Sequence, residues 1–122
     1  MTILERVRKI LDGCKFSYSN EKQLQALIAQ AFEKGHMHPV REWNLGDGDI
    51  IDFLIDAGVE FGFGIEVKTK EPPAKVLRQL ERYAQHKEIN QLLLITSVPA
   101  HGRLPQSING KPLHIYGLWG KF

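Results

Sequence analysis

The spacing of apolar residues along the chain predicts three amphipathic helices. The first covers 2–13 and begins with a capping box formed by Thr2 and Glu5, followed by apolar residues at helical spacing. The second covers 19–35, with a Ser-Asn start, one apolar stripe and a glycine at its end. The third begins at Pro72, because proline suits the first turn of a helix. Two helices therefore precede a segment of different periodicity, and one follows it.

Strands are predicted between and after these helices, where apolar residues alternate or run without interruption. A short strand over 39–45 is followed by a turn, a strand over 50–56 and a returning strand over 60–69. The run QLLLITSV at 91–98 is apolar throughout, as expected for a strand covered on both faces. A loop-rich tail then leads to a last strand over 113–119. The order helix, three-stranded meander, helix, strand predicts an α/β fold with a mixed central sheet flanked by helices.

Length and composition favour a soluble globular protein with a single domain over 1–122. A chain of this length can bury one core, and 43% hydrophobic with 25% charged residues is ordinary for that class. No segment is long and apolar enough to span a bilayer, and the N-terminus lacks the uninterrupted apolar stretch of a signal peptide. Cys14 has no partner for an internal disulfide, which fits a reducing compartment. We therefore expect a cytoplasmic location and no membrane partner.

Charged residues interrupt the returning strand at positions that share one face. Side chains alternate across a strand, so the apolar residues of one parity form a core face. These residues are Phe61, Phe63, Ile65 and Val67. The other parity carries Glu66 and Lys68 beside Gly62 and Gly64, and glycine inside a strand is typical of a place where a ligand or another backbone comes close. Glu66 and Lys68 would equally suit the solvated face of an edge strand.

Asp52 stands in the apolar segment 50–55, where both faces of a strand look buried. A carboxylate there is costly unless a cation or hydrogen-bond donors compensate it. The register of the hairpin decides whether Asp52 shares a face with Glu66. The two side chains lie on the same face only if the residue numbers of each pair across the hairpin add up to an even number. A three-residue loop over 57–59 meets this condition and pairs Asp52 with Gly64, diagonal to Glu66. We predict this register and expect the two carboxylates to converge.

Two convergent carboxylates with a neighbouring lysine suit a hard divalent cation such as Mg²⁺, which takes oxygen ligands and for which Mn²⁺ can substitute. Lys68 would act there as an electrostatic clamp or, if its pKa falls, as a proton acceptor. Glu21 lies on the apolar stripe of the second helix, one turn beyond its buried part, and is expected to point toward the sheet. An acid in a first turn is also favoured by the helix dipole alone, so both interpretations of Glu21 stay open.

The combination of Glu21 on an early helix, Asp52 in an apolar strand and the segment IEVK at 65–68 resembles the PD-(D/E)XK nuclease superfamily. The order of elements over about 19–97 is also that of the superfamily's restriction-endonuclease-like core. The strand IEVKTK is similar to that of archaeal Holliday-junction resolvases, which are small dimers. Ile51 stands directly before the aspartate, where the superfamily motif has a proline that many members lack.

The resemblance implies a metal-dependent nuclease and a set of site residues. The implied catalytic residues are Glu21, Asp52, Glu66, Lys68 and Gln79, and the implied metal ligands are Asp52, Glu66, Val67 and Glu21. In such enzymes the lysine positions or activates the attacking water. Gln79, with Tyr83 one turn later, is similar to a glutamine that several branches of the superfamily place beside the site.

A basic ribbon on the third helix is the candidate surface for DNA. Its positive residues recur at three- and four-residue steps, with one lysine just before the helix. They are Lys70, Lys75, Arg78 and Arg82, followed by His86, while His101, Arg103 and Lys111 in the tail would extend a surface for the DNA backbone. A solvated helix face explains the same pattern, and the net charge of +2 does not by itself indicate a partner.

We expect a Mg²⁺-dependent DNA endonuclease that hydrolyses phosphodiester bonds. Its sharpest form is a homodimer that resolves branched DNA, and its broader form is a structure-insensitive or partner-directed nuclease. Two alternatives stay open. One is a catalytically inactive nucleic-acid-binding or assembly module with the same fold. The other is an unrelated α/β protein in which Glu66 and Lys68 form an exposed ion pair.

Overall fold

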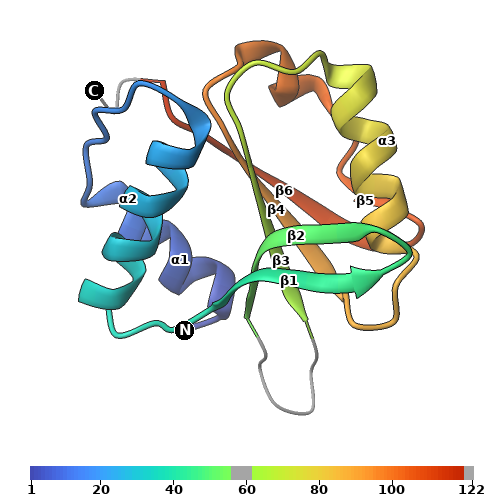
Figure 1. The fold of residues 1–122 in the computed structure, drawn as a ribbon, viewed down its shortest axis with the longest axis horizontal. Helices are drawn as coiled ribbons and strands as arrows, with labels where there is room; N and C mark the ends of the chain where they lie inside the picture. Colours follow the sequence, from blue (N-terminus) through green and yellow to red (C-terminus); the bar gives the residue numbers. More distant parts are fainter. Residues whose placement is uncertain (56–61, 120–122) are drawn as a thin grey trace.

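A computed structural model describes residues 1–55 and 62–119 and shows an α/β fold with a mixed six-stranded sheet (Figure 1). The elements, in chain order, are α1 (Ile3–Asp12), α2 (Glu21–Lys34), β1 (Val40–Gly46), β2 (Asp49–Ile55), β3 (Phe63–Lys68), α3 (Pro73–Ala84), β4 (Gln91–Thr96), the 3-10 helix η1 (Pro99–Arg103), β5 (Ser107–Ile108) and β6 (Lys111–Gly117). No helix in the described ranges has both the length and the apolar character needed to cross a membrane.

The sheet has the order β1-β2-β3-β4-β6-β5, so β3 and β4 lie in its interior. The first three strands form the expected antiparallel meander, and β4 pairs parallel to β3 after the crossover through α3. β6 pairs parallel to β4, and the short β5 pairs antiparallel to β6. α1 and α2 lie on one side of the sheet and α3 lies on the other (Figure 1). From α2 to β4 the elements therefore follow the predicted order.

Local end signals explain where the first two helices begin. The Thr2 hydroxyl accepts the Glu5 N–H, and the Glu5 carboxylate accepts the Thr2 N–H, which confirms the capping box. The Asn20 side chain caps α2. The expectation of a loop-rich tail over 99–112 is only partly correct, because η1 and β5 lie within it. Both short elements are held by local hydrogen bonds: η1 by bonds between residues three apart, and β5 by a tight hairpin with β6 that turns at Asn109 and Gly110.

Two apolar clusters fill the space on either side of the sheet. The cluster under α1 and α2 contains Phe63, Ile65 and Val67, which confirms these three members of the core face predicted for β3, whereas Phe61 lies outside the described residues. The cluster under α3 contains the apolar stripe of that helix. β4 contributes alternate residues to both clusters, so it is covered on both faces as predicted. The polar residues of β3 therefore face the layer between the sheet and α3.

β2 and β3 pair in a register whose parity is the expected one. Leu54 pairs with Gly64, and all recorded pairs of these strands sum to the same even number. The pairing of Asp52 with Gly64 was wrong by two residues, because continuing the observed register sets Asp52 against Glu66. The loop over 57–59, on which that prediction relied, lies outside the described residues.

Positions 62 and 64 have no room for a side chain, because other parts of the protein lie against Gly62 and Gly64. A Cβ atom at Gly62 would lie 1.4 Å from the backbone carbonyl oxygen of Glu88. A Cβ atom at Gly64 would lie 2.5 Å from a terminal carbon of Ile51 and 2.9 Å from one of Ile89. The glycines thus allow the close approach of backbone at one position and of side chains at the other, not of a ligand.

We expect Gly62→Ala to destabilise the fold by more than about 3 kcal/mol, because backbone atoms must move to admit the methyl group. Gly64→Ala should cost about 1–3 kcal/mol, because flexible side-chain ends can give way. Urea unfolding of both variants measures the difference. Equal and small losses in the two variants would contradict the packing described for Gly62.

Candidate functional site

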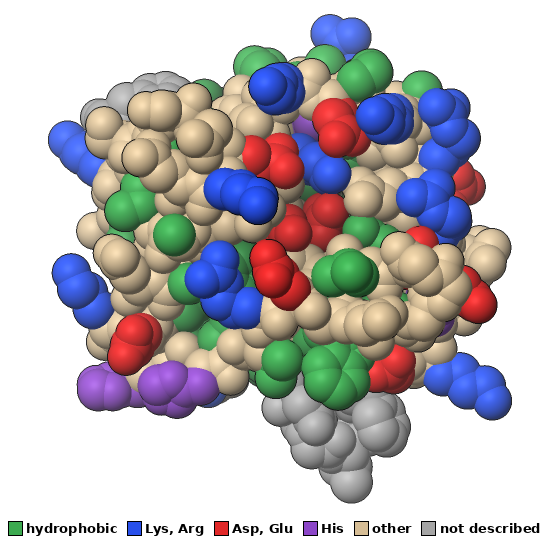
Figure 2. Space-filling model, in the orientation of Figure 1, with side chains coloured by type: hydrophobic (Ala, Val, Ile, Leu, Met, Phe, Trp, Pro, Cys, Tyr) green, Lys and Arg blue, Asp and Glu red, His purple; other side chains and the backbone are tan. Residues whose placement is uncertain are grey.

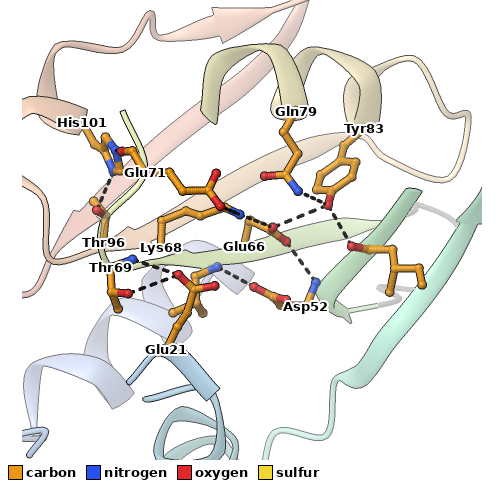
Figure 3. Close-up of polar contacts among 12 residues, drawn as sticks. Glu21, Asp52, Glu66, Lys68, Thr69, Glu71, Gln79, Tyr83, Thr96 and His101 are labelled. Carbon is orange, nitrogen blue, oxygen red and sulfur yellow. Dashed lines mark hydrogen bonds and ion pairs between the residues drawn. The ribbon is translucent and has the colours of Figure 1, made fainter. Parts of the chain in front are cut away.

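Glu66 and Lys68 of β3 lie side by side in the interior of the protein. Their strand runs between β2 and β4, and the two residues are only 3% and 5% exposed. The Lys68 ammonium lies 3.4 Å from Glu66 Oε2 (Figure 3). The alternatives of a solvated edge strand and of an exposed ion pair are therefore wrong. A charged pair in this position must be compensated by other protein groups or by a ligand.

Asp52 on β2 is joined to β3 by two reciprocal hydrogen bonds. Its N–H donates to Glu66 Oε1 at 3.2 Å, and its Oδ2 accepts the Val67 N–H at 2.8 Å (Figure 3). The alternation of β2 changes at this residue, because Ile51 packs under α3 whereas Phe53 packs under α1 and α2. The change of direction lets the Asp52 carboxylate reach the backbone of β3. The two acids that the sequence predicts to converge are thus brought together.

Burial raises the pKa of both carboxyl groups. Loss of solvent is the main cause, and it raises the pKa of Asp52 to about 6 and the pKa of Glu66 well above its ordinary value. The charge of Glu21 further raises the pKa of Asp52, and the charge of Asp52 further raises that of Glu66. The backbone donors and Lys68 oppose these effects without cancelling them. Negative charge at this point is therefore only partly compensated by the protein.

Lys68 is held between two carboxylates. Its Nζ lies 3.4 Å from Glu66 Oε2 and 3.6 Å from Glu71 Oε1. Burial acts to lower the pKa of Lys68, but the charges of Glu66, Glu71 and Glu21 outweigh it and raise that pKa. Lys68 is thus a cation at neutral pH in this arrangement. The geometry favours the electrostatic clamp over the proton acceptor.

Tyr83 connects the site to α3. Its hydroxyl donates to the Ile50 carbonyl oxygen at 2.8 Å, lies 3.5 Å from Glu66 Oε2 and accepts the Gln79 Nε2–H at 2.8 Å (Figure 3). Burial, followed by the charge of Glu66, raises the pKa of Tyr83, so the hydroxyl keeps its proton. The Gln79 amide nitrogen donates its hydrogen bond to Tyr83, and the buried amide oxygen Oε1 has no hydrogen-bond partner among the described residues. Such an oxygen is costly unless a further donor reaches it.

Glu21 reaches the sheet from the first turn of α2 but does not join the Asp52–Glu66 pair. Its Oε1 accepts the N–H of Thr69 at 3.0 Å and the hydroxyl of Thr69 at 3.3 Å. Val67 lies beside the pair and donates its N–H to Asp52. Within the described ranges, no three Asp, Glu, His or Cys side chains are gathered as a ready metal cage. The two carboxylates are adjacent, and the third predicted acid is held by another partner.

The basic ribbon of α3 is only partly free. Lys70, Lys75 and Arg78 are exposed. Arg82 is exposed as well, with 57% of its side chain accessible, but it forms an ion pair with Asp49, with 3.4 Å between Nε and Oδ1, and His86 contacts the same carboxylate at 2.9 Å. Those two residues tie α3 to the start of β2. Figure 2 shows Asp and Glu side chains in the middle of the face that carries the site, with Lys and Arg side chains around them.

Two tail residues that the sequence suggests for DNA binding have structural roles. His101 is fully buried and bonds to Thr96 and to the Glu71 carbonyl oxygen. The Lys111 ammonium donates to two carbonyl oxygens at the C-terminal end of α3, those of Ala84 and His86. Burial accordingly lowers the pKa of Lys111. Sequence analysis missed Thr69 and Glu71 as members of the site, although both directly follow the IEVK segment.

Comparisons of the chain with family models, with curated proteins and with solved structures found no match. Fold and site together define the class: an α/β protein whose mixed sheet carries the buried Glu66 and Lys68 beside the half-buried Asp52. What this cluster does must be argued from its geometry and charge.

We expect Asp52→Asn to remove a loss of stability that the natural protein shows as pH rises. Folding raises the pKa of Asp52 from 3.8 to about 6, so the folded state favours the protonated acid. The resulting stability is present below about pH 4 and is lost as pH rises through about 6, at about 1.4 kcal/mol per pKa unit. The difference in free energy of unfolding, variant minus natural protein, should therefore increase by about 1–3 kcal/mol from pH 4 to pH 7.

Urea unfolding in a chelating buffer at each pH measures this difference. Asp47→Asn is the matched control, because Asp47 is exposed and the same chemical change there should give no such trend. Parallel pH curves for the natural protein and Asp52→Asn would show that Asp52 titrates normally in the folded state.

Proposed function

We propose that the protein is a divalent-metal-dependent DNA endonuclease of the PD-(D/E)XK type, which hydrolyses phosphodiester bonds. The observation that carries this proposal is the Asp52–Glu66 pair, a half-buried and a buried carboxylate on neighbouring strands beside the cationic Lys68. Burial raises the pKa of both acids, so the protein alone leaves their negative charge undercompensated. The element order from α2 to β4 supports a restriction-endonuclease-like form of the α/β fold.

The donor set of the pair fits Mg²⁺, which takes oxygen ligands and is commonly held by one or two carboxylates. Asp52 and Glu66 would bind the ion through their carboxylate oxygens, and the backbone carbonyl oxygen of Val67 would be a further ligand. Glu21 would join them by exchanging its bonds to Thr69 for the ion or for its water. When bound, Mg²⁺ would stabilise negative charge on the scissile phosphate as a Lewis acid, and Mn²⁺ would substitute for it.

Lys68 and Gln79 supply the remaining groups of the proposed site. The Lys68 ammonium stays protonated between Glu66 and Glu71, so it can donate hydrogen bonds to a phosphate oxygen or to the attacking water. The unpartnered Gln79 Oε1 can accept a hydrogen bond from that water. Tyr83 holds the Gln79 amide in the orientation that leaves this oxygen free. The site therefore offers a donor and an acceptor beside the carboxylate pair.

The DNA backbone is proposed to run along the exposed lysines and arginine next to the site. Lys70 lies between β3 and α3, Lys75 lies in the first turn of α3 and Arg78 lies near its middle, and all three are exposed. Phosphate contacts of this kind position DNA without reading its sequence. Selectivity for branched DNA and a homodimer are the sharpest form of the proposal, because shape can select a substrate where few groups read bases. We propose action in the cytoplasm.

A specific observation favours one second candidate, a non-catalytic nucleic-acid-binding or assembly module. Asp52 and Glu66 each accept a backbone N–H from the other's strand, so hydrogen bonds offset part of their burial without a metal. In that case the pair would serve to join β2 to β3. Replacement of Lys68 would then leave DNA binding intact, and no condition would produce cleavage.

We expect the protein to cleave DNA in the presence of Mg²⁺ and to lose this activity in a chelator. Linear duplex, single-stranded and four-way-junction DNA should be incubated with the natural protein, with Lys68→Ala and with Glu66→Gln. Each substitution should lower the cleavage rate by at least about 100-fold, because it removes a group next to the reacting phosphate. Gel analysis of end-labelled DNA measures the rates.

The matched controls are Lys87→Ala and Glu81→Gln, which make the same chemical changes at exposed positions. Both should cleave like the natural protein. Cleavage that persists equally in Lys68→Ala would mean that another site or a contaminant is responsible. Binding without cleavage of every substrate would favour the non-catalytic module.

A further inference from the structure

His101 is a buried histidine whose two ring nitrogens both have partners. The residue is 0% exposed, with Nε2 2.6 Å from the Glu71 carbonyl oxygen and Nδ1 2.7 Å from the Thr96 hydroxyl. A carbonyl oxygen only accepts hydrogen bonds, so Nε2 carries a proton. The Thr96 hydroxyl accepts the Val98 N–H at 3.0 Å, which leaves its own proton free for Nδ1. One neutral tautomer therefore satisfies both contacts.

The contact with Glu71 links this histidine to the candidate site. The Glu71 carboxylate lies 3.6 Å from Lys68 Nζ, the same ammonium group that lies 3.4 Å from Glu66 (Figure 3). Its side chain is 31% exposed, so packing alone does not hold it in place. His101 holds the backbone of the same residue at 2.6 Å. The histidine thus fixes the backbone position from which the Glu71 side chain reaches Lys68.

The end of β4 strengthens this link. Ser97 donates its N–H to the Lys68 carbonyl oxygen at 3.2 Å, and its hydroxyl to the Thr69 carbonyl oxygen at 3.4 Å. The segment from Lys68 to Glu71 is therefore fastened at three of its four residues to the end of β4 and to η1. The fastened segment ends at Glu71, whose carboxylate forms the second ion pair of Lys68.

We propose that His101 and Glu71 are positioning residues that hold the Lys68 ammonium away from full ion pairing with Glu66. With Glu66 as its sole close carboxylate, Lys68 would collapse onto it and occupy the oxygen that the proposed metal needs. The second carboxylate draws the ammonium to nearly equal distances, 3.4 and 3.6 Å, from the two acids. The catalytic part of this inference rests on the proposed nuclease function, whereas the geometric part does not.

Two substitutions of His101 separate positioning from simple packing. Gln places its amide nitrogen near the position of Nε2 and keeps the bond to the Glu71 carbonyl oxygen. Asn reaches only the position of Nδ1 and keeps the bond to Thr96. His101→Gln should therefore keep the position of Lys68, and His101→Asn should lose it. Glu71→Gln removes the charge at a partly exposed position and leaves the core unchanged, so it tests the same link if His101→Asn fails to fold.

Cleavage of DNA and the side-chain nitrogen signal of Lys68 in nuclear magnetic resonance are the two measurements. We expect His101→Asn and Glu71→Gln to lower kcat about 10- to 100-fold with KM changed less than about twofold, because a misplaced group weakens the reaction more than binding. His101→Gln should keep kcat within about threefold of the natural value. The Lys68 signal should shift or broaden in the first two variants and stay unchanged in His101→Gln.

The two measurements fail in different ways. If Glu71→Gln leaves both kcat and the Lys68 signal unchanged, the positioning role is overturned, while the loss of cleavage in Lys68→Ala would still support the nuclease. Equal behaviour of His101→Asn and His101→Gln would reduce His101 to a packing residue and overturn its part. If the natural protein cleaves no DNA, the proposed function fails, and the Lys68 signal alone decides the geometric link.

Discussion

The arrangement of the whole site depends on keeping two carboxylates close together where water is largely excluded. Asp52 and Glu66 each receive a backbone N–H from the neighbouring strand, and these two bonds hold β2 and β3 together next to the pair formed by Phe53 and Ile65. Backbone donors satisfy hydrogen bonding but carry no full charge, so they leave most of the desolvation cost in place. Lys68 on β3 lies at the same point, because its ammonium group stabilises negative charge that solvent no longer reaches.

The parts of this arrangement that could be predicted are those set by short-range patterns. The apolar spacing of the helices and the capping box at Thr2 are local, and the structure confirms them. The alternation of β3 is local too, and it correctly assigned Phe63 and Val67 to one face and Glu66 to the other. The parity of the β2–β3 register followed from requiring the two acids to meet. The register itself differed by two residues, because many loop lengths satisfy the same parity condition.

The parts that could not be predicted depend on contacts between distant segments. Whether Glu66 is solvated or buried is decided by β4, which covers the second edge of its strand and comes from beyond α3. Glu21 was predicted to turn toward the sheet, yet its nearest donors belong to Thr69, 48 positions later, and nothing in the helix pattern identifies them. His101 lies in a segment rich in proline and glycine, where no periodicity indicates burial. It becomes buried because η1 folds back over the end of β4 and brings the imidazole to Glu71.

The charge of Asp52 separates the two functions that the geometry leaves in competition. If its role were only to join β2 to β3, an asparagine oxygen could accept the same Val67 N–H without the desolvation cost that raises the pKa of the acid. The same argument applies to Glu66, whose hydrogen bond from the Asp52 N–H does not require a negative charge on the acceptor. Two avoidable charges on adjacent strands are difficult to explain by structure alone. A role that uses the charge itself, such as holding a divalent cation at a phosphate, accounts for both acids at once.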